Sequence, residues 1–459
     1  MRPTGKRTDV GSSRPYVTTV AEAANRARSA AAPSLERART LWRNPRVRLA
    51  VGLVAALVVL LSALRTAATP FTGGDLLYFT GRSHDLLTGR DPYAAALSGP
   101  RVTNGEYNDI FLYAPILYYL LAPLSLVRFA TAWWIWSALN AGFLMGGCVA
   151  VVKLMRPQAS LALGLVLAVA VTFTSMARFE LYYGNVDVLL LCLLATAALA
   201  ARGGKTLLAG VLLGLTPVVY LQALPIVLYY LWKREYRVVI IGAATFFAAE
   251  ALGFLLAPAG TLGHFWSIIT YFFGDWSAIY INQSLYGLLA RWFRPMLYSA
   301  GPLLNLPWLP ALGWLALAAV VLTLTGHRIA RRPIAAGDSH RAGLELALAI
   351  AGLCLIFPVL EANTFILAGL PLIALALAVA TTWSGATRRF QALGIALVIF
   401  FAVSTLGLTR LMARLSEQSG LHGFGLLALT IGAAPYLYLA AALFALICVA
   451  LPEPKNAAI

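Results

Sequence analysis

A short polar segment after the first long apolar run carries the residue types best suited to chemistry. In residues 73–85, Gly-Gly-Asp-Leu-Leu-Tyr-Phe-Thr-Gly-Arg-Ser-His-Asp, positions i, i+3, i+7 and i+10 are Asp75, Tyr78, Arg82 and Asp85. A helix places these four side chains on one face. A carboxylate beside a guanidinium suits a site that takes a proton from a hydroxyl near an anionic leaving group. From spacing alone, the solvated face of an amphipathic helix is the simpler interpretation.

Later connectors between apolar runs supply candidate binding residues. A lone histidine is more often structural than catalytic, and Ser284 fits a helix N-cap at the start of an amphipathic stretch, 285–293. We therefore expect the polar residues around position 284 to support a site that other segments build. The candidates are Arg178, Glu180, Asn185, Asp187, Tyr220, His264, Asn282, Gln283 and Arg291.

The sequence predicts neither a metal site nor a cofactor. No group of His, Cys, Asp and Glu has metal-ligand spacing, and the four cysteines all lie inside apolar runs, where a thiol acts as a small hydrophobic group. No disulfide framework is implied. Few acids lie within apolar runs, and Asp187, Glu250 and Glu345 each lie near an end. An ion-coupled carrier usually keeps charges near the bilayer midplane, so this pattern favours an enzyme at the membrane interface.

The elements that position these residues must be membrane helices. The chain has 459 residues, of which 60% are hydrophobic and only 12% are charged, against about 25% in soluble proteins. Lipid must therefore cover much of the surface, and helices satisfy their own backbone groups in lipid. The net charge of +17 does not indicate nucleic-acid binding, because eleven Arg and Lys residues lie in residues 1–48.

Placing every basic cluster on one side of the membrane predicts an all-α polytopic bundle of about twelve spans. Residues 1–46 are expected to form a disordered basic cytoplasmic tail, 47–451 the transmembrane domain and 452–459 a second short tail. Of the 35 Arg and Lys residues, 25 then lie inside, as the positive-inside rule requires. The expected spans are 47–64, 130–152, 161–176, 186–201, a two-helix hairpin at 206–232, 238–256, 308–324, 343–359, 364–380, 392–408 and 424–451.

This threading leaves two long connectors outside the membrane. The first, 65–129, contains the segment at 73–85 and a juxtamembrane helix at 110–127 that Pro115 and Pro123 interrupt. The second, 257–306, contains His264 and Asn282-Gln283.

An ordered set of motifs resembles glycosyltransferase family 87. The motifs are Gly73-Gly74-Asp75, Leu87-Thr-Gly-Arg-Asp-Pro-Tyr93, Phe111-Leu-Tyr113-Ala-Pro115 with Pro123, Tyr183-Gly184-Asn185-Val-Asp187, Ala209-Gly210-Val-Leu-Leu-Gly214-Leu and Asn282-Gln283-Ser284-Leu285. Each is weak alone, but they follow the family's order across residues 70–290, about half of the chain.

The resemblance implies a membrane enzyme of the GT-C class that uses polyprenyl-phosphate sugars outside the cytoplasmic membrane. Known types of this family transfer mannose or arabinofuranose to envelope glycans of actinobacteria. Asp75 matches the first-loop acid that serves as catalytic base in this class. The resemblance also implies an inverting transfer, with no cofactor.

Two positions depart from the family pattern. The family usually has Gly-Gln-x-Asn where this chain has Gly184-Asn-Val-Asp187, and often a lysine at the hairpin turn where this chain has Pro217-Val-Val-Tyr220. Without that lysine, the donor phosphate would need another cation. Arginine can grip phosphate with two hydrogen bonds. The available arginines are Arg82, Arg178 and Arg291.

These observations predict a glycosyltransferase in the cytoplasmic (inner) membrane, with its active site on the extracytoplasmic side. Its expected partners are the lipid bilayer, a polyprenyl-phosphate sugar donor and a glycan or glycolipid acceptor, with no nucleic acid. Two alternatives remain at this stage: a non-enzymatic translocator of lipid-linked sugars, and an inactive structural relative.

The threading has a direct test by cysteine labelling. In a cysteine-free background, single cysteines at positions 104 and 276 should react with a membrane-impermeant reagent added outside, and a cysteine at position 204 only after the membrane is opened. Labelling at 104 or 276 from the cytosolic side alone would contradict the threading.

Overall fold

The computed structural model describes residues 33–451 except 35, 39, 70–71, 95–96, 98–101, 104–105, 108–112, 274–281, 295–301, 336–337, 362, 383–387 and 406–434. Two compact units comprise Met1–Val54 and Ala55–Ile459. The predicted tails at 1–46 and 452–459, and labelling positions 104 and 276, lie largely or wholly outside the described residues. The features below belong to the second unit.

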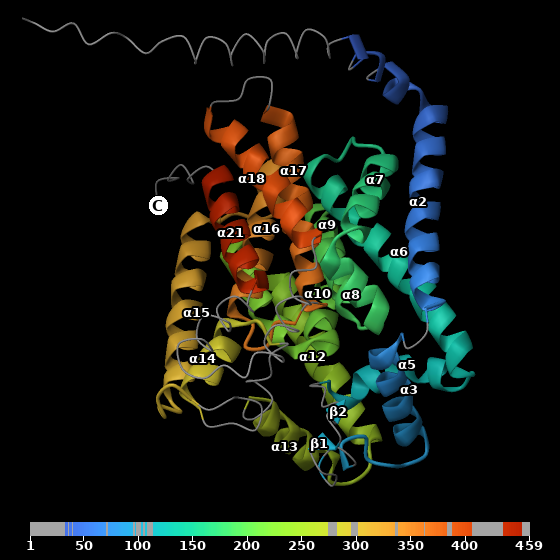
Figure 1. Ribbon diagram of the computed structural model, residues 1–459, viewed down its shortest axis with the longest axis vertical. Coiled ribbons are helices and arrows are strands. Elements are labelled where there is room, and N and C mark those ends of the chain that lie inside the picture. Colours follow the sequence, from blue (N-terminus) through green and yellow to red (C-terminus); the bar gives the residue numbers. More distant parts are fainter. Residues whose placement is uncertain are drawn as a thin grey trace, which may run out of the picture. The chain divides into compact units, whose positions relative to one another are not determined.

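The regular elements of the described residues are helices apart from one pair of two-residue strands, so the all-α prediction is confirmed (Figure 1). Strands β1 (Val102–Thr103) and β2 (Glu106–Tyr107) pair antiparallel, with Val102 opposite Tyr107. The helices are α2 (Pro45–Ala67), α3 (Gly74–Leu87), α5 (Pro115–Ser125), α6 (Phe129–Met155), α7 (Leu161–Thr172), α8 (Ser175–Tyr183), α9 (Asp187–Arg202), α10 (Thr206–Val219), η1 (Leu221–Ile226), α11 (Val227–Trp232), α12 (Tyr236–Leu256), α13 (Thr261–Phe273), α14 (Leu285–Phe293), α15 (Leu309–Arg328), α16 (Ser339–Ile356), η3 (Thr364–Ala368), α17 (Gly369–Thr382), α18 (Arg388–Thr405) and α21 (Pro435–Ala450).

Within the described residues, six helices are long and apolar enough to cross a membrane, or seven if the bent pair α7 and α8 is one span. The predicted number of twelve is not confirmed, because four further apolar helices are shorter: α5, α10, η1 with α11, and α21. The predicted hairpin at 206–232 corresponds to α10, η1 and α11. The predicted juxtamembrane helix corresponds to α5, which begins at Pro115.

The predicted span at 161–176 is broken in the structure. The chain bends by 83° between α7 and α8. Thr174 causes the new start, because its side chain accepts a hydrogen bond from the backbone N–H of Ala177 and caps α8. The bend extends the segment to Tyr183 and turns Glu180 towards the interior.

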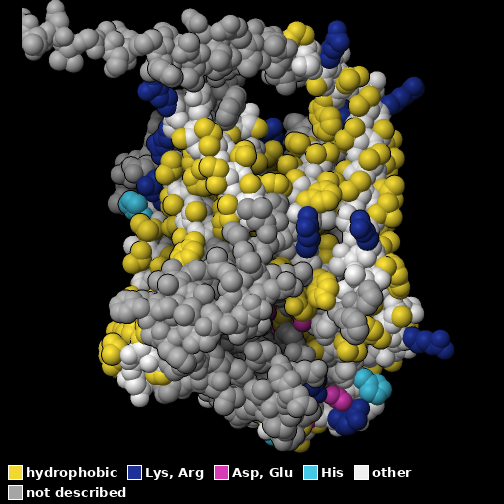
Figure 2. Space-filling view, viewed as in Figure 1, with side chains coloured by type: hydrophobic (Ala, Val, Ile, Leu, Met, Phe, Trp, Pro, Cys, Tyr) yellow, Lys and Arg dark blue, Asp and Glu magenta, His cyan; other side chains and the backbone are white. Residues whose placement is uncertain are grey.

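Burial separates central helices from lipid-facing ones. Helix α16 is buried at every position from Ala342 to Ile356, as expected of a helix that is apolar on all sides. Helices α12 and α15 bury only a small share of their length. Hydrophobic side chains cover much of the visible described surface, which suits contact with lipid (Figure 2).

The connectors predicted to lie inside contact one another. The ammonium group of Lys233 lies 2.7 Å from Glu345 Oε2, and Arg341 Nε donates to Glu345 Oε1 at 2.8 Å. Arg202 donates to Ser339 in the same set of connectors. These contacts bring together Arg202, Lys233 and Arg341, which belong to basic clusters that the threading places on one side of the membrane. In Figure 1, α3, α5 and α13 gather at the lower end of the view.

Trp133 of α6 holds the start of α3 against the junction of α8 and α9. Its indole N–H donates to the carbonyl of Ala67 at 3.0 Å and the hydroxyl of Thr72 at 3.1 Å. Gly73 and Gly184 both have positive φ angles, 81° and 74°, and both pack against the Trp133 ring. The Gly73 N–H also donates to the carbonyl of Tyr182 at 2.8 Å. Two tight turns therefore meet on one indole ring.

We predict that Gly184→Ala lowers the free energy of unfolding by about 2–4 kcal/mol, because an added Cβ meets the Trp133 ring and the backbone disfavours a side chain there. Gly89→Ala is the matched control: its φ is 72°, but no atom lies within 4 Å of the added Cβ. It should cost only the backbone strain, about 1–2 kcal/mol. Denaturant unfolding in detergent micelles measures both, and equal losses would contradict the packing role of Trp133.

Candidate functional site

Five connectors meet at one place and bring several of the predicted residues together. They are the start of α3, the α8–α9 junction, the α10–η1 turn, the segment before α14 and the loop between α16 and η3. The negative charges of Asp187 and Asp75 both lie close enough to Glu180 to interact electrostatically with its carboxyl group. Three of the predicted acids therefore form one electrostatic cluster.

Burial distinguishes the three acids. Glu180 and Asp187 are both 0% exposed, whereas Asp75 is half-buried. Glu180 Oε1 accepts the backbone N–H of Val188 at 3.1 Å, and Asp187 Oδ2 accepts an amide hydrogen of Asn363 at 3.3 Å. Glu180 thus binds the backbone at the start of α9, Asp187 binds the side chain of Asn363, and Asp75 is the acid of the three that an incoming molecule can reach.

A buried tyrosine and a buried amide line the cluster. Tyr113 donates its hydroxyl hydrogen to Asn185 Oδ1 at 2.9 Å, and the same oxygen accepts the N–H of Val186 at 2.7 Å. Burial, reinforced by the charge of Asp187, raises the pKa of Tyr113 well above its usual range. Tyr113 is therefore a neutral hydrogen-bond donor near pH 7. The prediction did not single it out as a site residue, although it lies in the quoted motif around Pro115.

Tyr220 packs beside Tyr113 and completes this wall. The two ring centroids are 6.0 Å apart, and Gln222 Nε2 donates to the Tyr220 hydroxyl at 3.0 Å. Tyr220 stands in the turn where the family often has lysine, so this chain offers an aromatic hydroxyl at that point.

The loop 357–364 contributes residues that the prediction missed. Glu361 interacts electrostatically with the hydroxyl groups of Tyr113 and Tyr220, and the side-chain amide of Asn363 donates a hydrogen bond to Asp187. The available signal was a pair of polar residues, Glu361 and Asn363, that begins three residues after Pro358 between two apolar runs. Such a connector looks like any other loop unless its tertiary contacts are known.

Asn282 and Gln283 hold this loop in place. Asn282 Nδ2 donates to the carbonyl of Pro358 at 3.1 Å, and its Oδ1 accepts the N–H of Leu360 at 3.0 Å. The N–H of Gln283 donates to the Leu360 carbonyl at 2.7 Å. Both side chains are almost completely buried. These contacts hold the loop that carries Glu361, and the substrate-binding role expected for Asn282 and Gln283 stays a prediction.

Arg291 contacts Asn282 and is almost completely buried. It is 6% exposed, and its Nη1 donates to the carbonyl of Asn282 at 2.8 Å. Burial lowers the pKa of the Arg291 guanidinium to about 10, which still leaves it charged at neutral pH. Ser284 caps α14 by accepting the N–H of Gly287, as expected, and α14 has the predicted bounds.

Tyr78, Arg82 and His264 contact residues outside the acid cluster. Tyr78 and Arg82 continue along the same face of α3, where the Arg82 guanidinium lies 4.8 Å from the Tyr78 ring centroid. His264 Nδ1 lies 2.6 Å from Asp91 Oδ2 and ties α13 to the turn after α3. Arg178 is exposed on α8, two residues before Glu180.

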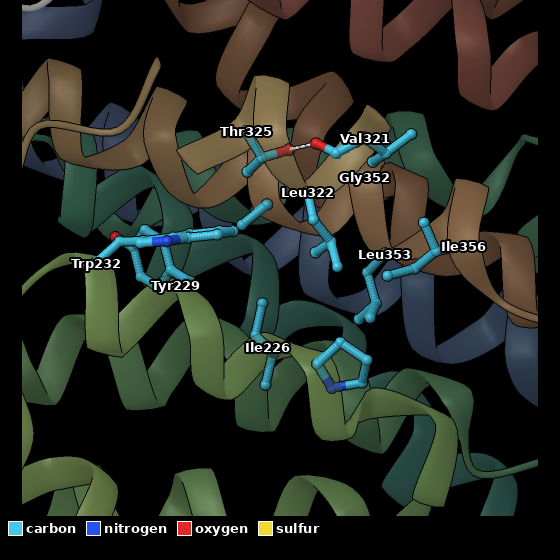
Figure 3. A pocket seen from close by; sticks show the side chains of 11 residues that line it. Ile226, Tyr229, Trp232, Val321, Leu322, Thr325, Gly352, Leu353 and Ile356 are labelled. Carbon is cyan, nitrogen blue, oxygen red and sulfur yellow. Dashed lines mark hydrogen bonds between the residues drawn. The ribbon is translucent and has the colours of Figure 1, made fainter. Parts of the chain in front are cut away.

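A small apolar crevice between α11, α15 and α16 is unsuited to the same chemistry (Figure 3). Its volume is about 20 Å³, room for one water molecule. The hydroxyl of Thr325 donates to the carbonyl of Val321, within its own helix. No carboxylate lines the crevice, so no base is available there. Among the described residues, no three His, Cys, Asp or Glu side chains are grouped to hold a metal ion.

Comparison with known proteins identifies a family. The sequence model of glycosyltransferase family 87 matches residues 111–358, more than half of the chain. No curated protein sequence matches significantly. Among solved structures, the apo form of the oligosaccharyltransferase of Archaeoglobus fulgidus is similar, with a TM-score of 0.40 and 14% sequence identity over 90% of this chain and 57% of that chain. This chain thus spans little more than half the length of that structure.

We predict that Asn282→Asp lowers the free energy of unfolding by about 1–3 kcal/mol, because the new oxygen cannot donate to the Pro358 carbonyl, which keeps only its hydrogen bond from Ser284, and because a carboxylate is placed at a buried position. Asn305→Asp, at an exposed position, is the control and should change stability little. Thermal unfolding in detergent measures both variants. An Asn282→Asp protein as stable as the control would show that the loop does not depend on the hydrogen bond from Asn282 to the Pro358 carbonyl.

Proposed function

This chain belongs to glycosyltransferase family 87, and from that premise we propose that it transfers a sugar from a polyprenyl-phosphate donor to a glycan or glycolipid acceptor. The protein is a membrane glycosyltransferase. The donor sugar is of the mannose or arabinofuranose type, and the reaction takes place on the extracytoplasmic side of the cytoplasmic membrane. The observation that carries the proposal is the reachable carboxylate of Asp75 beside two enclosed acids and a wall of neutral hydroxyl and amide groups.

Asp75 acts as the general base in this proposal. Its carboxylate takes the proton of the acceptor hydroxyl as that oxygen attacks the anomeric carbon of the donor. The bond between that carbon and the phosphate oxygen breaks, and polyprenyl phosphate leaves as an anion. A single displacement inverts the configuration, and positioning with charge stabilisation supplies most of the rate.

The position of Asp75 supports this role. It lies in the first turn of α3, where the partial positive charge of the helix N-terminus favours a carboxylate. Glu180 and Asp187 are 0% exposed, so an acceptor cannot reach either carboxylate, whereas Asp75 is only half-buried. In this proposal Tyr113 and Asn185 orient sugar hydroxyls, and Tyr220 does so from the opposite connector.

Exposure favours Arg178 as the cation for the donor phosphate. The leaving phosphate is anionic and needs a paired cation near apolar surface. Arg178 is exposed on α8, two residues before Glu180, and Tyr183 at the end of the same helix is also exposed. Arg291 is enclosed and bonded to Asn282, so we assign it to the support of the loop at 357–364.

We predict that Asp75→Asn lowers sugar transfer by about 10²–10⁴-fold, because the amide keeps the shape of the side chain but cannot accept the proton. Donor binding and the unfolding temperature should be unchanged. Radiolabelled transfer by purified protein measures the effect. Asp338→Asn, an exposed N-cap that asparagine fills equally well, is the matched control and should transfer at the normal rate.

A folded Asp75→Asn protein with near-normal transfer would exclude Asp75 as the base. A translocator predicts that outcome, because movement of a lipid-linked sugar needs no proton acceptor. An inactive relative predicts no transfer by any form of the protein, so the wild-type measurement distinguishes it.

We also predict that Arg178→Gln raises the KM for the donor roughly tenfold, since a charge-assisted contact to phosphate is lost. Arg291→Gln should instead lower the unfolding temperature and leave the donor KM of the folded fraction unchanged. Initial-rate kinetics and thermal unfolding separate the two effects. The opposite pattern, with donor KM sensitive to Arg291 alone, would reverse the assignment.

A further inference from the structure

The turn at residues 91–93, just after α3, joins two segments that lie far apart in the sequence. Its Asp91 carboxylate faces α13, where Oδ2 lies 2.6 Å from His264 Nδ1. The other carboxylate oxygen, Oδ1, accepts the backbone N–H of Tyr93 at 2.8 Å. The Asp91 side chain is 11% exposed and that of His264 is 48% exposed. One largely buried carboxylate therefore fixes the backbone of the turn and also holds α13.

Tyr93 connects this turn to the wall of the candidate site. Its side chain is 1% exposed, and its hydroxyl donates to the backbone carbonyl of Tyr113 at 2.6 Å. Tyr113 in turn donates to Asn185 Oδ1 at 2.9 Å. Buried polar groups that are bonded to one another hold a single arrangement. Tyr93 therefore sets the position of the backbone from which the Tyr113 phenol extends into the wall.

Ring contacts connect α13 to the same turn. Phe265, the neighbour of His264, is buried, and its ring centroid lies 5.6 Å from that of Tyr93. The opposite face of α13 is exposed at Leu262 and Trp266. The face that carries Phe265 therefore attaches α13 to the turn, and the contact of His264 with Asp91 adds a polar attachment beside it.

We propose that Asp91 and Tyr93 are positioning residues for sugar transfer and that His264 couples them to α13, an inference that rests on the function proposed above. Tyr93 is too deeply buried to touch a substrate, so it acts through Tyr113, whose hydroxyl orients a sugar hydroxyl. Asp91 keeps Tyr93 in place. The sequence predicts His264 as a substrate-binding residue, whereas this assignment has its imidazole fix α13 against the turn.

Steady-state transfer kinetics of the purified full-length protein test the positioning role. Tyr93→Phe keeps the ring and its packing but removes the hydroxyl, so it should lower kcat about 10- to 100-fold and leave the donor KM unchanged. Tyr113→Phe should lower kcat by a similar factor. Because Tyr93 acts through Tyr113, the double variant should stay within about threefold of Tyr113→Phe alone. Losses that multiply in the double variant would overturn the positioning role, since a general structural defect adds to any other.

Amide hydrogen exchange of the same protein in detergent tests the coupling without any need for transfer. His264→Ala should raise exchange in α13 and at residues 116–119 of α5 about two- to fivefold, a modest rise because a half-exposed pair contributes little. His264→Asn places an amide N–H near the position of Nδ1 and should restore slow exchange. Ser267→Ala is the matched control on α13: its exposed hydroxyl donates to the Gly263 carbonyl of the same helix, so exchange in α5 should not change.

Exchange that rises in α13 alone, or in α5 equally for Ser267→Ala, would overturn the coupling. His264 is exposed, so its variants provide this test even if Tyr93→Phe does not fold. Failure of the coupling leaves transfer by the wild type and its dependence on Asp75 intact. Absence of transfer by the wild type would instead contradict the proposed function, and the exchange of α5 would still decide whether α13 is coupled to the wall.

Discussion

The contact of Trp133 with two glycine turns is the constraint on which the site depends. Gly73 precedes Asp75 by two residues, and Gly184 precedes Asp187 by three, so one indole ring sets the distance between two acids that lie far apart in the sequence. Trp136 adds a hydrogen bond from its indole N–H to the carbonyl of Gly184 at 2.8 Å. Only residues without a Cβ fit such a close approach at positive φ.

A second constraint comes from the need to pair buried polar groups. The loop at 357–364 crosses the interior, where an unpaired backbone group costs free energy comparable to a lost hydrogen bond. Asn282 accepts the backbone N–H of Leu360 in this loop, and Asn363 of the same loop donates a hydrogen bond to Asp187. The polar groups that fold this region therefore also orient the site. A mutation that harms stability here is expected to harm catalysis as well.

The sequence predicted the elements but only part of their arrangement. Periodicity is a local property, so it identified α3 with its face of Asp75, Tyr78 and Arg82, and the bounds of α14 with its Ser284 cap. A single threonine inside an apolar run caps α8 after the bend between α7 and α8. A hydropathy profile averages over such a residue, so it does not predict the bend. The role of Arg291 behind Asn282 depends on tertiary contacts that no spacing rule describes. The family motifs marked segments around the site, whereas the Glu361 loop lies beyond the last of them.

The central claim is that an acid reached from outside the bundle serves sugar transfer from a lipid phosphate. The most direct measurement supplies the purified protein, in lipid vesicles, with a panel of labelled polyprenyl-phosphate sugars and an envelope glycolipid acceptor. The account predicts that at least one donor transfers its sugar, and that the new linkage has the inverted anomeric configuration. Transfer from a nucleotide sugar with none from any polyprenyl phosphate, or a product with retained configuration, would contradict it.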